Sequence, residues 1–285
     1  MKELMSWQIL QWMQMAIKIS LLILLFLSAS INIAFGKCHI EKSIVSLSGP
    51  MTHFLEELDL VRDENLKAIS KFHPLKKEFK GEVLAGGLFL SPQVFHKYKD
   101  ALIVFDKSRE FKYLLEKSNH MNFLEIDSRD QDPFEVINLL EVKALGFLKG
   151  CRSKLSDTSK KFKSLKEKLL TKNIEIKANF FLGSLSGKLP ETIIANDGPV
   201  IFLRKFSGFS TYPSELAYVN WSMREFKRQK GFVNIGLNEA KTEEFKVKEV
   251  KPNYFDISYR GVLTPGIRQA YFLGELFKLS LFSSK

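Results

Sequence analysis

The folded part of the chain opens with two different spacings of apolar residues. Residues 44–47 form a short apolar run that suits a buried strand. After the turn at Ser48, Gly49 and Pro50, apolar residues recur at helical spacing: Met51, Phe54, Leu55 and Leu58. Pro50 fits a first helical position, so the pattern predicts a strand-turn-helix unit over 43–60. Such a turn points free backbone N–H groups toward a cleft.

The rest of the first half alternates between short strands and helices. The patterns predict strands at 66–70, 82–89, 101–105 and 122–126, and helices at 91–98 and 111–118. Such alternation is typical of a parallel sheet.

A long helical stretch follows, from Asp132 nearly to Lys172. Asp132 is a suitable N-cap, Pro133 fits the first helical position, and Glu135 completes a pattern like a capping box. Gly150 is the one expected interruption. We interpret this stretch as a strut that connects two α/β halves.

The second half starts again with an α/β pattern. It predicts strands at 178–182, 200–204, 232–236 and 254–257, a helix at 214–228, and a closing helix after Pro265. The sequence therefore predicts an α/β protein with a leader over 1–36, an N-terminal lobe over 37–131, a spanning helix over 132–172 and a C-terminal lobe over 173–285.

The first 36 residues have the pattern of a secretory signal. Lys2 and Lys18 precede an apolar run over 19–27, and small polar residues follow over 28–30. We therefore expect export to the periplasm. The run is shorter than the roughly 20 residues that span a bilayer comfortably, although an uncleaved leader would tether the protein to the inner membrane.

Only two cysteines occur, Cys38 and Cys151, and both belong to the exported part. An oxidising compartment permits a disulfide between them. Two unpaired, partly buried thiols are the alternative, because a sequence does not supply the Cα separation that a bridge requires.

The net charge of +11 comes from 43 basic and 32 acidic residues spread along the chain. The lysine-rich runs look like solvated helix faces, and no known nucleic-acid-binding motif occurs, so nucleic acid is not an expected partner. The positive field would attract anionic ligands or acidic surfaces.

Catalytic motifs are missing from the sequence. The five histidines show no H-x-x-x-H pair, and no G-x-S-x-G elbow occurs. The segment 183–189 is one residue short of a phosphate-binding loop and lacks the Ser or Thr after Lys188. We therefore expect a binding protein without a cofactor, not an enzyme.

The order of several short segments resembles a transport family. The segments are Ile44-Val-Ser-Leu-Ser-Gly-Pro50, Ala68-Ile-Ser70, Gly86-Gly87, Ser91-Pro92, Phe123-Leu-Glu-Ile-Asp127 and Val250-Lys-Pro-Asn-Tyr-Phe-Asp-Ile257. In this order the chain resembles the substrate-binding proteins of ABC importers for cobalamin and ferric siderophores, the helical-backbone metal receptor superfamily. The resemblance covers nearly all of the exported part.

The resemblance implies a class III periplasmic binding protein fold, with two α/β lobes joined by a long spanning helix. It also implies a monomer that captures a metal chelate, cobalamin or a ferric siderophore, for an ABC permease in the inner membrane. In that family one glutamate on each lobe docks onto the permease. Glu244 is close to this position on lobe two, whereas Gln93 occupies it on lobe one.

Two other interpretations remain open. A bare-metal or haem receptor would need His53 and His73 to face the cleft. Alternatively, the protein would be an envelope interaction protein that keeps the fold without transport, as Gln93 would allow.

In this fold the ligand lies at the carboxyl ends of the strands. The candidate ligand residues are Ser48, Gly49, Phe72, His73 and Phe89 on lobe one, and Arg204, Tyr212, Tyr259 and Arg260 on lobe two. Phe72 matches a position where a family aromatic packs against the ligand. His73 would ligate iron or cobalt or bind an anionic chelate, or else it caps backbone groups before Pro74. Trp221 is a weaker candidate, because a helical tryptophan is more often part of the core.

Overall fold

A computed structural model describes most of the chain after residue 37. The described residues are 18–20, 38–71, 79–84, 92–107, 109–117, 122–172, 177–186, 192–206, 214–216, 218–220, 232–240 and 244–279. The chain divides into two units, residues 1–38 and 39–285. In the first unit, residues 18–20 are helical. All elements below belong to the second unit.

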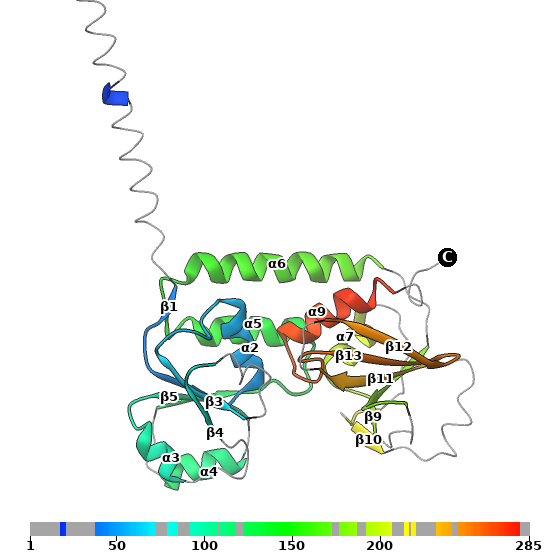
Figure 1. The fold of residues 1–285 in the computed structure, drawn as a ribbon, viewed down its shortest axis with the longest axis horizontal. Helices are drawn as coiled ribbons and strands as arrows, with labels where there is room; N and C mark the ends of the chain where they lie inside the picture. Colours follow the sequence, from blue (N-terminus) through cyan, green and yellow to red (C-terminus); the bar gives the residue numbers. More distant parts are fainter. Residues whose placement is uncertain are drawn as a thin grey trace, which may run out of the picture. The chain divides into compact units, whose positions relative to one another are not determined.

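Lobe one is built on a five-stranded parallel sheet in the order β4-β3-β2-β5-β6. Its strands are β2 Ile44–Ser46, β3 Leu66–Ser70, β4 Glu82–Leu84, β5 Leu102–Asp106 and β6 Phe123–Ile126. Helix α2 covers Gly49–Glu57, α3 covers Pro92–Lys97 and α4 covers Arg109–Lys117. Helices α3 and α4 lie on one face of the sheet, and α2 lies on the other (Figure 1). This arrangement confirms the parallel sheet expected for the first half.

Lobe two contains a mixed sheet in the order β10-β9-β8-β11-β13-β12. Its strands are β8 Ala178–Leu182, β9 Thr192–Ile194, β10 Tyr218–Asn220, β11 Val233–Glu239, β12 Lys246–Lys251 and β13 Tyr254–Tyr259. The three central strands β8, β11 and β13 are parallel, while β9, β10 and β12 pair antiparallel at the edges. Helix α9, Ile267–Leu276, follows Pro265 as predicted.

The strand predicted at 200–204 is wrong, because these residues belong to helix α7, Gly198–Phe206. A run of four apolar residues fits a buried strand and a buried helix equally well. The helix forms because Val200, Phe202 and Leu203 are buried, and the Phe202 ring packs 5.0 Å from the Phe134 ring. The helix predicted at 214–228 is wrong over Tyr218–Asn220, which form β10.

The stretch predicted as one spanning helix folds as two. Helix α5, Pro133–Ala144, and helix α6, Arg152–Leu170, are separated by a turn and the two-residue strand β7, Leu148–Lys149. Asp132 caps α5 as predicted, since its Oδ1 accepts the N–H groups of Phe134 and Glu135, each at 2.9 Å. Gly150 ends the interruption with a φ of 66°. The 19 residues of α6, about 28 Å of helix, then extend alongside both lobes (Figure 1).

Helices from both lobes pack together in the middle of the second unit. Helix α5 contacts α2, α6, α7 and α9, and α9 also contacts α2 and α6. The lobes therefore share a helical layer beside the two sheets. In the described ranges, no helix is both long and apolar enough to cross a membrane. Cys38 and Cys151 are both disulfide-bonded, one of the two states that the sequence left open.

Candidate ligand-binding cleft

A cleft of about 540 Å³ lies where the carboxyl ends of the lobe-one strands face lobe two. Its size is typical of a site for a small organic molecule. Residues from lobe one and residues from lobe two both line it: Pro50, Asp106, Ser128, Arg129, Asp130, Asp197, Tyr218, Leu263 and Pro265. The position at the strand ends is the one expected for a ligand site in an open α/β sheet.

Asp106, the last residue of β5, forms the lobe-one wall of the cleft. Its Oδ1 accepts hydrogen bonds from Ser48 Oγ at 3.2 Å and Ser128 Oγ at 3.0 Å. Burial raises the pKa of Asp106 to about 6, although these hydroxyls and the Gly49 N–H oppose the rise. Ser48 also caps α2, since its Oγ accepts the Met51 N–H at 3.2 Å. The turn at Ser48 and Gly49 therefore fixes the position of the Asp106 carboxylate in the cleft wall.

Asp197 and Tyr218 form the facing wall on lobe two. The Tyr218 hydroxyl donates to Asp197 Oδ2. Burial raises the pKa of both groups, and the neighbouring carboxylate adds to the rise for Tyr218. Tyr218 therefore keeps its proton at neutral pH and acts as a fixed donor.

The described lining is acidic, although the whole chain is strongly basic. It contains the carboxyl groups of Asp106, Asp130 and Asp197 and the single guanidinium of Arg129. Carboxylates accept hydrogen bonds and repel other carboxylates. This part of the cleft therefore suits a ligand that presents amide, hydroxyl or cationic donors.

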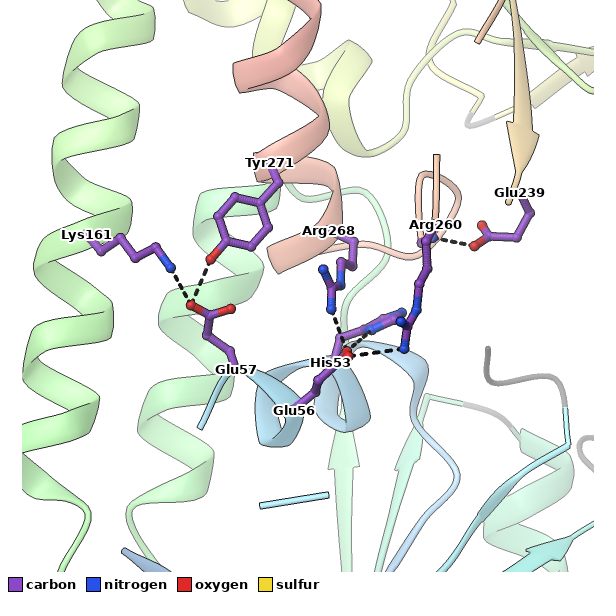
Figure 2. A network of polar contacts seen from close by, with 9 residues as sticks. His53, Glu56, Glu57, Lys161, Glu239, Arg260, Arg268 and Tyr271 are labelled. Carbon is purple, nitrogen blue, oxygen red and sulfur yellow. Dashed lines mark hydrogen bonds and ion pairs between the residues drawn. The ribbon is translucent and has the colours of Figure 1, made fainter. Parts of the chain in front are cut away.

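A largely buried ionic network joins the two lobes (Figure 2). We call it the interlobe network and define it by His53, Glu56, Arg260 and Arg268. Glu56 of α2 accepts from Arg260 Nη2 at 3.1 Å and from Arg268 Nη2 at 2.7 Å. His53 Nδ1 lies 3.1 Å from Glu56 Oε2. One lobe-one carboxylate is thus held by two lobe-two arginines.

The protonation states in this network follow from burial and hydrogen bonding. Burial opposes ionisation of Glu56, but the hydrogen bonds from His53 and Arg268 and the charges of both arginines outweigh it and hold its pKa at about 2. Burial lowers the pKa of His53. A neutral His53 that donates from Nδ1 to an ionised Glu56 is consistent with both shifts.

Two neighbouring carboxylates extend the connection (Figure 2). Glu57 Oε1 accepts from Lys161 Nζ of α6 at 2.5 Å and from the Tyr271 hydroxyl of α9 at 2.7 Å. Glu239, at the end of β11, accepts the Gly261 N–H. Because Gly261 lies two residues before the cleft residue Leu263, its contact with Glu239 positions part of the cleft wall.

Three residues predicted to bind the ligand have other contacts. Arg260 is buried in the interlobe network, and Tyr259 is 6% exposed and packs 5.9 Å from the Phe245 ring. Arg204 is on a helix, not at a strand end, and its Nη1 donates to Ala195 O, Asn196 Oδ1 and Ser214 O. None of the three belongs to the described cleft lining.

Several predicted residues lie outside the described residues: Phe72, His73, Phe89, Tyr212 and Trp221. Glu244 is exposed and forms an ion pair with Lys246 at 2.9 Å, and Gln93 is exposed on α3. The docking role of Glu244 stays a prediction.

Sequence reasoning missed the residues that line the described cleft. Asp106 directly follows one predicted strand, and Ser128 comes two residues after another, so the rule of strand carboxyl ends could have identified them. Asp197 and Tyr218 could not be found in this way, because the elements beside them, α7 and β10, were predicted in the wrong class.

The segment that resembled a short phosphate-binding loop holds a carboxylate from the chain itself. Asp256 accepts the Leu185 N–H at 2.5 Å, the Ser186 N–H at 3.2 Å and the hydroxyls of Ser184 and Ser186, each at 2.5 Å. These donors lower the pKa of Asp256 against the opposing effect of burial. The loop is therefore occupied internally.

The described ranges contain no group of three or more His, Cys, Asp or Glu side chains that could hold a metal ion. His53 is buried in the interlobe network and is not part of the cleft lining. A receptor that holds bare metal or haem through both His53 and His73 therefore lacks one of the two histidines that it needs.

Comparisons with known proteins relate this geometry to solved structures. No family model and no curated protein sequence matches the chain. The periplasmic haem-binding protein HutB of Vibrio cholerae is similar in structure, with a TM-score of 0.64 and 13% identity over 84% of this chain and 98% of that one. The periplasmic haem-binding protein BhuT in complex with two haems has a TM-score of 0.62 and 10% identity over 85% and 97%.

The periplasmic vitamin B12-binding protein BtuF of Vibrio cholerae is also similar, with a TM-score of 0.52 and 14% identity over 69% of this chain and 76% of that one. At these identities the likeness concerns the fold. The chain has the two-lobed α/β fold of the class III periplasmic binding proteins.

Proposed function

We propose that the protein is an exported solute-binding protein that captures a metal chelate, cobalamin or a ferric siderophore, and delivers it to an ABC permease. The observation that carries the proposal is the cleft of about 540 Å³ between two lobes of this fold. The similar structures are named as binding proteins for haem and vitamin B12, which supports binding in place of catalysis.

The cleft chemistry favours a chelate rich in hydrogen-bond donors. Cobalamin carries amide groups around its ring, whereas haem carries two carboxylates. Asp106, Asp130 and Asp197 can accept from amides but would repel propionates. We therefore rank cobalamin before haem, while haem remains the alternative because two of the similar structures bind it.

The interlobe network supports a mechanism in which the two lobes move little relative to each other when the ligand binds. Glu56 binds two arginines of the other lobe, and Glu57 binds groups on α6 and α9. Opening the lobes at this point would leave buried charges without partners, which is costly. The ligand would thus enter a cleft that is already largely formed. Transfer would begin when the permease contacts exposed groups such as Glu244.

A thermal-shift screen of the exported protein tests the proposal. Cobalamin, several ferric siderophores, haem and free divalent metals are added separately. A ligand at a hundred times its Kd should stabilise the protein by about 2.7 kcal/mol. Leu263→Trp, which fills the cleft, should abolish the shift. Leu145→Trp is the matched control and should retain it, because Leu145 is 55% exposed and is not part of the described lining.

Each other outcome favours a different function. Stabilisation by haem alone would contradict the ranking of cobalamin before haem and would indicate a haem receptor. Stabilisation by free metal alone would indicate a metal receptor. A shift with none of these ligands would contradict the proposal and favour an envelope interaction protein.

A further inference from the structure

The first strand of the second unit lies beside the turn between α5 and α6. Strand β1, His39–Ile40, pairs antiparallel with β7, so His39 lies opposite Lys149. The Glu41 N–H also donates to Phe147 O at 2.9 Å. The first residues of the folded unit are therefore fixed at this turn.

The same turn exposes two large apolar side chains. Val142, in the last turn of α5, is 66% exposed, and Leu145, just after it, is 55% exposed. Their neighbours Phe147 and Leu148 are buried, so the turn is anchored in the core while these two side chains point to solvent. Because they are three positions apart at the end of a helix, Val142 and Leu145 lie on the same side of it.

Several residues next to this apolar pair in the sequence are basic. Lys143, Lys149 and Arg152 are exposed, and their long apolar stems allow the charged groups to reach past buried neighbours. Acidic groups at this corner include Glu41, whose Oε1 lies 3.8 Å from Lys149 Nζ, and Asp63, whose Oδ2 accepts the Ile40 N–H at 3.2 Å, and Glu141 precedes Val142 in the sequence. We call Val142, Lys143, Leu145, Lys149 and Arg152 the leader-side surface. Apolar side chains among basic ones are typical of binding at a bilayer interface.

The leader sequence indicates which partner this surface would meet. A leader held in a membrane by residues 19–27 would keep Cys38 within about 40 Å of that membrane, because eleven residues extend no further. Basic residues close to an anionic bilayer add attraction that increases with the anionic lipid content. We propose that the leader-side surface binds the interface of an anionic phospholipid bilayer.

This interaction would leave the cleft accessible. The cleft residues Ser128, Arg129 and Asp130 precede α5, whereas the leader-side surface begins in its last turn. The 12 residues of α5 separate the two sites by about 18 Å of helix. The protein could therefore hold a ligand while it rests on the membrane. Membrane binding at this surface would not depend on which ligand the cleft binds.

A fluorescence experiment tests the proposal whether or not the leader is cleaved. Leu145→Trp introduces an indole at the surface, and Leu216→Trp is the control, since Leu216 is 66% exposed on lobe two. Each exported variant is mixed with vesicles of phosphatidylglycerol and phosphatidylcholine that carry brominated acyl chains. We expect a blue shift and quenching for Leu145→Trp beyond the signal of the unsubstituted protein, and neither effect for Leu216→Trp.

A second measurement tests the chemistry of the contact. In the Leu145→Trp background, Lys143→Gln with Lys149→Gln should weaken the quenching several-fold in vesicles with phosphatidylglycerol. Lys246→Gln with Lys248→Gln, on β12, is the charge-matched control and should have no effect. Absence of extra quenching for Leu145→Trp, or equal quenching for both tryptophan variants, would overturn the proposal. Equal quenching with phosphatidylcholine alone would overturn the role of anionic lipid.

Discussion

Glu56 Oε2 and Arg268 Nη2 lie 2.7 Å apart, although Glu56 belongs to lobe one and Arg268 to lobe two. Arg260 approaches the other carboxylate oxygen at 3.1 Å. A carboxylate with an exposed fraction of only 18% is thus matched by two buried guanidinium groups. The relative placement of the lobes is therefore fixed by charge as well as by the helical layer.

Glu56→Gln should strongly destabilise the protein. The substitution removes one negative charge and leaves two buried arginines facing a neutral amide. Breaking a buried ion pair in this way typically costs about 3–5 kcal/mol. Chemical denaturation at pH 7 measures the loss. Glu244→Gln is the control, because its exposed pair with Lys246 is worth about 1 kcal/mol or less. Equal losses for the two variants would contradict the role of the network.

Acid should remove the same stabilisation. The pKa of Glu56 is lowered from 4.5 to about 2 in the folded protein, so its contribution is fully present above pH 4.5. It is lost as the pH falls from about 4.5 through about 2, and a shift of this size corresponds to about 3 kcal/mol. Stability measured against pH should therefore fall more steeply in this window for the natural protein than for Glu56→Gln. If stability fell equally with pH in the two proteins, Glu56 would not be the group responsible for the loss.

Asp106→Asn should stabilise the protein near neutral pH. Burial raises the pKa of Asp106 from 3.8 to about 6, so the folded state loses stability as the pH rises from about 3.8 through about 6. Asparagine keeps an oxygen that can accept from Ser48 and Ser128 but carries no charge. We expect a gain of about 3 kcal/mol at pH 7 and almost none at pH 3.5. Thermal melts at both pH values measure it, and an equal gain at both would show that charge is not the cause.

Helix starts were predictable where the sequence contains clear turn and capping residues. Gly49 and Pro50 mark the start of α2, and Asp132 with Pro133 marks the start of α5. The run at 200–204 has no such mark within it, and its class was decided by packing of Phe202 against Phe134, 68 positions earlier in the chain. Local pattern cannot supply contacts of that range.

The location of the candidate site was predictable from the sequence, but only some of its lining residues were. The strand-end rule located the cleft, and it applies to Asp106 and Ser128. The rule also suggested Arg260, which does follow a strand. Its guanidinium binds Glu56, 204 residues away in sequence, so the same arginine that could have bound a ligand connects the lobes. Only the tertiary structure distinguishes these two uses.

Asp256→Ala should loosen the loop at 183–186. The carboxylate accepts two backbone N–H groups and two hydroxyls, and hydrogen bonds to a charged group contribute about 1.5–3 kcal/mol each when they are lost. Amide hydrogen exchange at Leu185 and Ser186 should accelerate at least tenfold. Ser186→Ala removes one hydroxyl only and should accelerate exchange less. Unchanged exchange in Asp256→Ala would contradict the internal occupancy of this loop.

Glu244→Ala should separate delivery from capture, if the protein serves a permease as proposed. Glu244 is exposed, and its carboxylate pairs with the neighbouring Lys246 at the surface, so its loss should leave the fold and the cleft unchanged. Uptake of the labelled chelate into cells should fall several-fold, while the thermal shift that the chelate causes in the exported protein stays the same. Lys246→Ala is the matched control: it removes the other half of the surface pair but keeps the carboxylate, so uptake should be retained. Normal uptake with Glu244→Ala would show that lobe two docks through other residues.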